Sequence, residues 1–81
     1  MVVVWDERKR ADNLAKHGMD FVDLTEEFFL SSQVLAAKKG RLKALGRFAD
    51  GTIAVVFAAL GAEGVSVISM RPASKKERSL P

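Results

Sequence analysis

Hydrophobic and polar residues follow a helical period in the first part of the chain and the period of two typical of strands in the later part. Before the helical pattern begins, Val2 to Trp5 is a short run of β-branched and aromatic residues, which predicts a strand. Asp6 is an N-cap for a helix over residues 7–17, because its carboxylate can accept a hydrogen bond from an unpaired amide of the first turn. Gly18 supplies the C-terminal stop of this helix.

A second helix is predicted from Asp20 onward, with this residue as its N-cap and with Met19 and Leu24 placed for a hydrophobic staple. Its apolar positions follow the spacing that puts side chains on one face of a helix. The first helix has fewer apolar residues, so we expect both helices to lie on a sheet and the first to be more exposed. The apolar stripe of the second helix contains Phe21, Leu24, Phe28 and Phe29.

Strands separated by turn residues occupy the next part of the chain. Turns are predicted at Lys39-Gly40, at Asp50-Gly51, which is a strong hairpin signal, and between Gly61 and Gly64. The third of these strands is apolar at nearly every position, as expected for a central strand covered on both faces. The predicted strands span Gln33–Lys38, Arg41–Phe48, Thr52–Leu60 and Val65–Met70.

At the C-terminal end, Ser74 and Glu77 form the S-x-x-E capping box that begins a short helix over Lys75–Leu80. Together the elements predict an α+β fold, with two N-terminal helices packed on an antiparallel four-stranded meander sheet, a short N-terminal strand and a short C-terminal helix. A length of 81 residues allows one domain, residues 1–81, with a small core. Domains of this size often depend on a partner subunit for stability.

Charge is distributed unevenly along the chain. Residues 1–30 contain four Lys or Arg and seven Asp or Glu, a balance of −3, whereas residues 31–81 contain nine and three, a balance of +6. The positive field of the later part attracts polyanions such as RNA, or an acidic protein. The absence of cysteine fits a cytoplasmic protein, and we expect no signal peptide and no membrane span because no apolar run is long enough.

Most familiar catalytic motifs are absent, including glycine-rich phosphate loops, the nucleophile elbow and the two-histidine zinc motif, so we expect no metal and no cofactor. The remaining candidates are basic residues that can meet around one face of the sheet. On the second predicted strand of the meander, Arg41, Lys43 and Arg47 share a face, which indicates a phosphate-facing surface. Arg71 precedes a proline, so its backbone is restricted while its guanidinium can reach over the sheet.

The polar residues of the first helix form a single stripe, because Asp6, Lys9, Asn13, Lys16 and His17 are separated by steps of three, four, three and one. This spacing permits two interpretations. The stripe is either a solvated helix face, with His17 as a partner of the helix dipole, or the wall of an active site. Asn13 is a weak helix former, which makes its mid-helix position slightly unusual.

Two motifs resemble the BrnT family, the toxin half of a bacterial type II toxin–antitoxin pair whose members are similar to small RelE-like ribonucleases. The first is W-D-x-x-K-x-x-x-N-x-x-K-H-G, met by residues 5–18, and the second is I-S-x-R-x-A-x-x-x-E-R, met by residues 68–78. Together they bracket nearly the whole chain. Between them, only Arg41 and Gly46 remain of the family's G-E-x-R element, and the chain lacks the tyrosine that often follows E-R.

The resemblance implies a RelE-like fold and a toxin that acts as a metal-independent endoribonuclease, inhibits translation and is neutralised by its antitoxin. In such chemistry the ribose 2′-OH attacks the adjacent phosphate, and cations stabilise the charged phosphorane. We expect Arg41 and Arg71 to stabilise the phosphate, and Lys16 or His17 to exchange protons. The residues expected to bind the RNA are Lys9, Asn13, Lys43, Arg47, Lys75, Lys76 and Arg78.

The expected partners are an RNA substrate and a BrnA-like antitoxin that forms a hetero-oligomer with the chain, with operator DNA contacted only through the antitoxin. The missing acidic residue and tyrosine leave a second function open, a binding module without catalysis that acts with an antitoxin at its operator. A plain nucleic-acid-binding domain outside any toxin system is a third. Fragmentation of RNA by the purified protein separates the first hypothesis from the other two.

Overall fold

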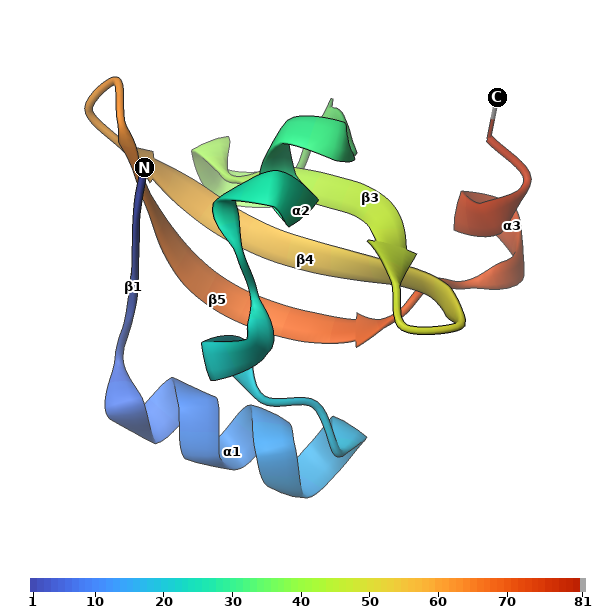
Figure 1. Cartoon of the computed structure of the whole chain (residues 1–81), viewed down its shortest axis with the longest axis horizontal. Helices are drawn as coiled ribbons and strands as arrows, with labels where there is room; N and C mark the ends of the chain where they lie inside the picture. Colours follow the sequence, from blue (N-terminus) through green and yellow to red (C-terminus); the bar gives the residue numbers. More distant parts are fainter. Residues whose placement is uncertain (81) are drawn as a thin grey trace.

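A five-stranded sheet organises the computed structural model, which describes residues 1–80 (Figure 1). The strands are β1 (Val2–Trp5), β2 (Gln33–Ala36), β3 (Leu42–Phe48), β4 (Gly51–Leu60) and β5 (Gly64–Pro72). The helices are α1 (Glu7–His17), α2 (Glu26–Ser31) and α3 (Lys75–Arg78), and two 3₁₀ turns are η1 (Phe21–Asp23) and η2 (Lys38–Gly40). The order across the sheet is β1-β5-β4-β3-β2, so β4 is central as its apolar sequence predicted. The expected cover on both faces is not complete, because Val56 is only half-buried and lines a cavity.

The N-terminal strand joins the sheet, which corrects the predicted four-stranded antiparallel architecture. Strands β2 to β5 form the expected antiparallel meander, but β1 pairs in parallel with β5 and makes the sheet mixed. The register sets Val3 opposite Val65 and Trp5 opposite Val67, and both β1 side chains pack against the core. No local sequence signal identifies this partner, because residues 6–63 separate the two strands.

Helix α1 begins and ends where its capping residues predicted. The Asp6 carboxylate accepts a hydrogen bond from the N–H of Arg8 at 2.8 Å. At the other end, the N–H of Gly18 donates to the carbonyl of Leu14, and Gly18 has a φ of +68°, which glycine adopts without strain. The chain then turns back toward the sheet.

The predicted second helix is divided into two shorter pieces. Asp20 caps η1 by accepting a hydrogen bond from Val22 N–H at 3.1 Å, but the backbone becomes extended at Leu24 and the helix stops. Thr25 then provides a new N-cap for α2, with its Oγ1 3.2 Å from the amide nitrogen of Phe28. The predicted apolar stripe is nevertheless buried at all four positions, Phe21, Leu24, Phe28 and Phe29.

The hydrophobic core lies on one side of the sheet. Helix α2 contacts β3, and α1 contacts β5. The ring of Phe28 lies directly over Gly46, where an added Cβ would be 2.9 Å from the ring Cε1 atom. The largest fully buried side chains are Phe21, Ile53, Met70, Val55 and Val67.

The turns set the boundaries of the strands. Strand β2 ends at Ala36, two residues before the predicted end, because Lys38–Gly40 forms η2 with Lys39 at a φ of 61°. Strand β5 extends to Pro72, beyond the predicted end at Met70, and α3 ends at Arg78 instead of the predicted Leu80. Pro81, which the predicted domain includes, lies outside the described residues. Within residues 1–80, no helix has the length and apolar character needed to cross a membrane.

Candidate functional site

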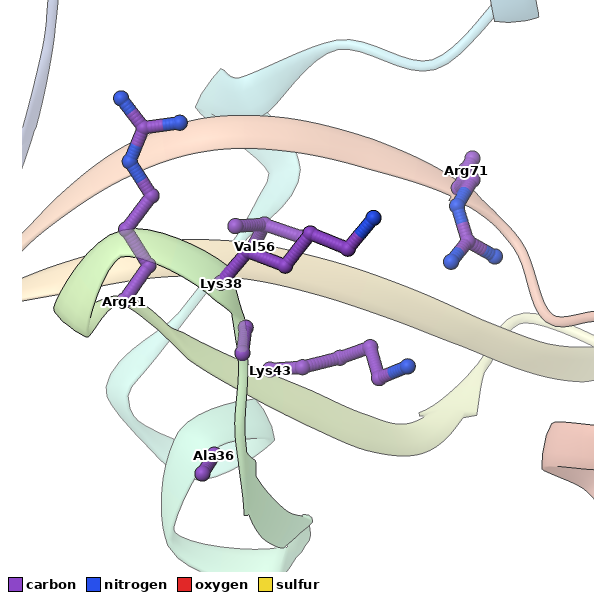
Figure 2. A pocket seen from close by; sticks show the side chains of 7 residues that line it. Ala36, Lys38, Arg41, Lys43, Val56 and Arg71 are labelled. Carbon is purple, nitrogen blue, oxygen red and sulfur yellow. The ribbon is translucent and has the colours of Figure 1, made fainter.

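A cavity of about 550 Å³ opens on the side of the sheet opposite the core (Figure 2). Its lining combines small or apolar side chains with four cations, and none of its lining residues is acidic. Strands β2, β3, β4 and β5 contribute one residue each, and the other three come from the segment between β2 and β3. The lining residues are Ala36, Ala37, Lys38, Arg41, Lys43, Val56 and Arg71.

Strand alternation places Lys43 and Arg71 on this open face. In β3, Ala44 is fully buried in the core, so the side chain of Lys43 points to the opposite face. Leu45 of the same strand pairs with Ala54 of β4, which in turn pairs with Arg71 of β5. Because directly paired residues share a face, Arg71 emerges on the same side as Lys43 although the two residues lie two strands apart.

A buried carboxylate holds these two cations together. The Nη1 and Nη2 atoms of Arg71 donate to Oε1 and Oε2 of Glu77 at 2.7 and 2.9 Å, and the Nζ of Lys43 donates to Oε2 at 2.7 Å. The N–H of Ser74 donates to Oε1 at 2.8 Å, as one half of the predicted capping box that begins α3. Only 8% of Glu77 is exposed.

The electrostatics of this cluster keep its groups charged. Hydrogen bonds from Arg71, followed in effect by those from Lys43 and Ser74, hold the pKa of the Glu77 carboxyl well below its usual range, although burial acts in the opposite direction. The carboxylate in turn raises the pKa of Arg71. A buried carboxylate that accepts four hydrogen bonds has little freedom to move, so the cluster is a fixed part of the cavity wall.

The other two cations of the cavity, Lys38 and Arg41, differ from this pair. Within residues 1–80, neither Lys38 nor Arg41 forms an ion pair. Figure 2 shows the side chains of Lys38 and Lys43 extending toward Arg71, whereas the guanidinium of Arg41 points to the other end of the cavity. Four positive charges with one adjacent negative charge leave a net attraction for an anion. In the same described residues, no group of three or more His, Cys, Asp or Glu is placed to hold a metal ion.

A second hollow, of about 290 Å³, is lined by two further arginines. Glu77, which bonds to two cations of the first cavity, is also part of the lining of the second, together with Arg47 and Arg78. Lys75 and Lys76 are exposed on α3 and line neither hollow. We call the six cations of the two hollows the basic track, which consists of Lys38, Arg41, Lys43, Arg71, Arg47 and Arg78.

The basic residues of α1 lie outside this track. Lys9, Lys16 and His17 line neither hollow, and α1 contacts the sheet through β5. The side chains of Lys9 and Lys16 are exposed, whereas His17 is half-buried in the last turn of the helix. The structure therefore brings together Arg41, Lys43 and Arg71 from the predicted set and leaves the candidates on α1 apart from them.

Asn13 points inward and has a structural contact for each part of its amide. Its Nδ2 donates to the carbonyls of Met70 at 2.9 Å and Met19 at 3.1 Å, and its Oδ1 accepts from the N–H of Met70 at 3.0 Å. Strand β1 ends opposite Val67, so it does not reach Met70. The amide of Asn13 makes the hydrogen bonds to the Met70 backbone that a longer β1 would otherwise make. Both hydrogens of the amide are used, so Asn13 has no donor left for a ligand.

The sequence does not predict two residues of the site. Its pattern puts Lys38 at the end of a strand, whereas Lys38 belongs to the η2 turn and lines the cavity. Glu77 was assigned only the capping of α3, yet the same carboxylate also binds Arg71 and Lys43. The signal that could have found Glu77 is its position six residues after Arg71, across a proline and a capping box that fold the chain back over the strand.

Comparisons with known proteins find a matching family and a similar solved structure. Residues 5–77 match the sequence profile of a family described as the ribonuclease toxin BrnT of type II toxin–antitoxin systems. The chain is 54% identical to the Brucella abortus ribonuclease toxin BrnT, whose crystal structure superimposes with a TM-score of 0.85, and the match covers 93% of this chain and 99% of that one. None of the curated proteins matches the chain significantly.

Proposed function

We propose, since the chain belongs to the BrnT family of ribonuclease toxins of type II toxin–antitoxin systems, that it is an endoribonuclease whose active site is the cavity beside Glu77. The observation that carries this proposal is the position of Arg71. Its guanidinium lines a cavity with three other cations and is held there by a buried carboxylate. Such a site can bind a phosphate and stabilise the negative charge that develops on it during cleavage.

The proposed reaction uses the RNA, the side chains of the cavity and water. The ribose 2′-OH attacks the adjacent phosphorus, the bond to the 5′-oxygen breaks, and a cyclic phosphate and a free 5′-OH result. Arg71 and Lys43 stabilise the phosphorane, and Arg41 binds a neighbouring phosphate at the other end of the cavity. The ammonium of Lys38, which has no ion-pair partner within residues 1–80, donates a proton to the leaving 5′-oxygen.

Proton transfer is assigned to the cavity and not to α1. Lys16 and His17, the sequence-based candidates, do not line the cavity. Glu77 is a poor base because hydrogen bonds from Arg71 keep its pKa low, so the proton of the 2′-OH passes to water. Because side chains and water fill every proposed role, we propose a metal-independent reaction.

The rest of the basic track extends the binding surface for the RNA backbone. Arg47 and Arg78 in the second hollow, with Lys75 and Lys76 exposed beside it on α3, would contact phosphates on one side of the cleavage point. Contacts of this kind release counterions, so RNA affinity should fall as salt concentration rises.

We also propose a protein antitoxin of the BrnA type as the partner of this chain, in a hetero-oligomer that contacts operator DNA through the antitoxin. Family membership supports this proposal. Expression of the chain in bacterial cells with and without a candidate antitoxin tests it. Growth arrest by the chain alone, with recovery and co-purification when the antitoxin is present, is the expected result, and arrest that continues in the presence of a bound antitoxin would contradict neutralisation.

Cleavage by the purified protein tests the enzymatic proposal. Incubation with total RNA is expected to produce fragments equally well with and without EDTA. Arg71→Lys keeps a positive charge beside Glu77 and so protects the fold, but lysine lacks the planar fork of arginine, and cleavage should fall by about 10²-fold or more. Arg8→Lys, on the exposed face of α1, is the matched control. Intact RNA at high protein concentration, with the antitoxin still bound, would favour the binding module without catalysis.

A further inference from the structure

The hydrogen bonds of Arg71 divide its guanidinium into a used edge and a free edge. Arginine has five N–H donors. Within residues 1–80, three of them have partners, because Nη1 donates to Glu77 and to the carbonyl of Pro72, at 2.7 and 3.3 Å, and Nη2 donates once to Glu77 at 2.9 Å. The N–H of Nε and the second N–H of Nη2 remain.

The two remaining donors lie on the same edge of the guanidinium plane. Nη2 is the terminal nitrogen on the side of the Nε–H bond, so the two free N–H bonds point in nearly the same direction and form a fork. A fork of this kind matches two oxygens of one phosphate, with geometry that a single ammonium cannot supply. Arg71 also lines the cavity, where Lys38 and Lys43 extend toward it (Figure 2).

We propose that Glu77 is a positioning residue, which holds the end of the Arg71 guanidinium so that its Nε–Nη2 edge receives two non-bridging oxygens of one RNA phosphate. The proposal deepens the function proposed above and rests on the same cavity. Glu77 suits this role because it is buried and anchored by the backbone N–H of Ser74 and by Lys43. Without the carboxylate, the guanidinium keeps its charge but loses the contact that fixes its plane.

If Glu77 only positions Arg71, its replacement should lower the rate of cleavage without weakening the binding of RNA. In Glu77→Gln the side chain keeps its size, but one of its two oxygens becomes an amide nitrogen, which cannot accept from Arg71. A misdirected guanidinium should reduce kcat by about 10- to 100-fold, because charge stabilisation depends on alignment. Binding of RNA should stay the same or become tighter, since the variant removes the negative charge that lies beside Arg71 and Lys43 of the basic track.

The test measures kcat for a cleavable RNA and Kd for a 2′-O-methyl oligonucleotide of the same sequence, which lacks the attacking hydroxyl. Glu77→Gln should lower kcat without weakening Kd, and the exposed Glu63→Gln should change neither. In an Arg71→Lys background, Glu77→Gln should have little further effect on kcat, because no fork remains to be aligned. An unchanged kcat in Glu77→Gln, or an undiminished effect in the Arg71→Lys background, would overturn the proposal.

A direct observation of the fork does not depend on cleavage. In ¹⁵N-resolved NMR spectra, the Nε–H signal of Arg71, assigned by its loss in Arg71→Lys, should shift saturably as the 2′-O-methyl oligonucleotide is added. The same signal in Glu77→Gln should shift less at full saturation. A wild-type signal that does not move while the oligonucleotide binds would exclude the fork, whereas binding with the expected shift but without cleavage of RNA would contradict only the proposed enzymatic function.

Discussion

Replacement of Asn13 by alanine should destabilise the fold strongly, although Asn13 lies within a motif of charged and polar residues on α1. Its amide closes the part of the β5 edge that β1 does not reach, through three hydrogen bonds to the backbone of Met70 and Met19. Met70 is fully buried, and only 7% of Asn13 is exposed. Alanine leaves the N–H and the carbonyl of Met70 without partners.

The expected size of the effect follows from these two orphaned groups. A buried backbone group without a hydrogen bond costs about 1–3 kcal/mol, so the pair costs about 2–6 kcal/mol. The better helix propensity of alanine returns roughly 0.5 kcal/mol. The free energy of unfolding should therefore fall by about 1.5–5.5 kcal/mol, and each kcal/mol lowers the Tm of a domain of this size by about 4–8 °C.

Urea denaturation followed by far-UV circular dichroism measures this change. Asp12→Ala, at the exposed neighbouring position, is the matched control and should alter the free energy of unfolding by no more than about 0.5 kcal/mol. Hydrogen exchange adds a local readout, because the Met70 amide should exchange faster in Asn13→Ala than global unfolding explains. Equal midpoints for Asn13→Ala and Asp12→Ala would refute the reasoning.

Three further changes have defined outcomes. Gly46→Ala places a Cβ 2.9 Å from the ring of Phe28 and should cost about 1–3 kcal/mol in guanidinium denaturation, whereas Gly51→Ala, with open space around its Cβ, should not. Because the pKa of Glu77 is lower in the folded protein than its ordinary value of 4.5, the ionised carboxylate stabilises the fold above pH 4.5 and this contribution is lost as pH falls. In urea titrations below pH 4.5, the free energy of unfolding should therefore fall for the wild type and much less for Glu77→Gln. Parallel curves for the two proteins would contradict this. His17→Gln should retain the wild-type rate of RNA cleavage, and a loss of about 10²-fold would return proton transfer to His17.

Elements with local chemical signals could be predicted from the sequence. The caps at Asp6, Gly18 and Ser74 define α1 and the start of α3 because a cap depends only on residues within a few positions. The four meander strands follow from alternation and from turn residues. The division of the second helix was not predicted because Asp20 and Thr25 both act as N-caps, whereas the prediction used Asp20 alone.

Features that depend on contacts between distant residues could not be predicted. The pairing of β1 with β5 and the Asn13–Met70 hydrogen bonds join opposite ends of the chain, and no spacing rule connects them. The same is true of the Lys43–Glu77 ion pair. Alternation in β3 indicated that Lys43 faces away from the core, but only the sheet order shows that Arg71 is close to it.

The central claim is that RNA is cleaved in the cavity that contains Arg71, and two neighbouring lysines of η2 test it most directly. Lys38 lines the cavity and has no ion pair within residues 1–80, whereas Lys39 carries the same charge in the same turn but does not line the cavity. The measurement is the single-turnover rate of RNA cleavage in EDTA for Lys38→Ala and Lys39→Ala. We predict a loss of about 10²-fold or more for Lys38→Ala and a rate close to that of the wild type for Lys39→Ala. Equal rates for the two variants would contradict the claim.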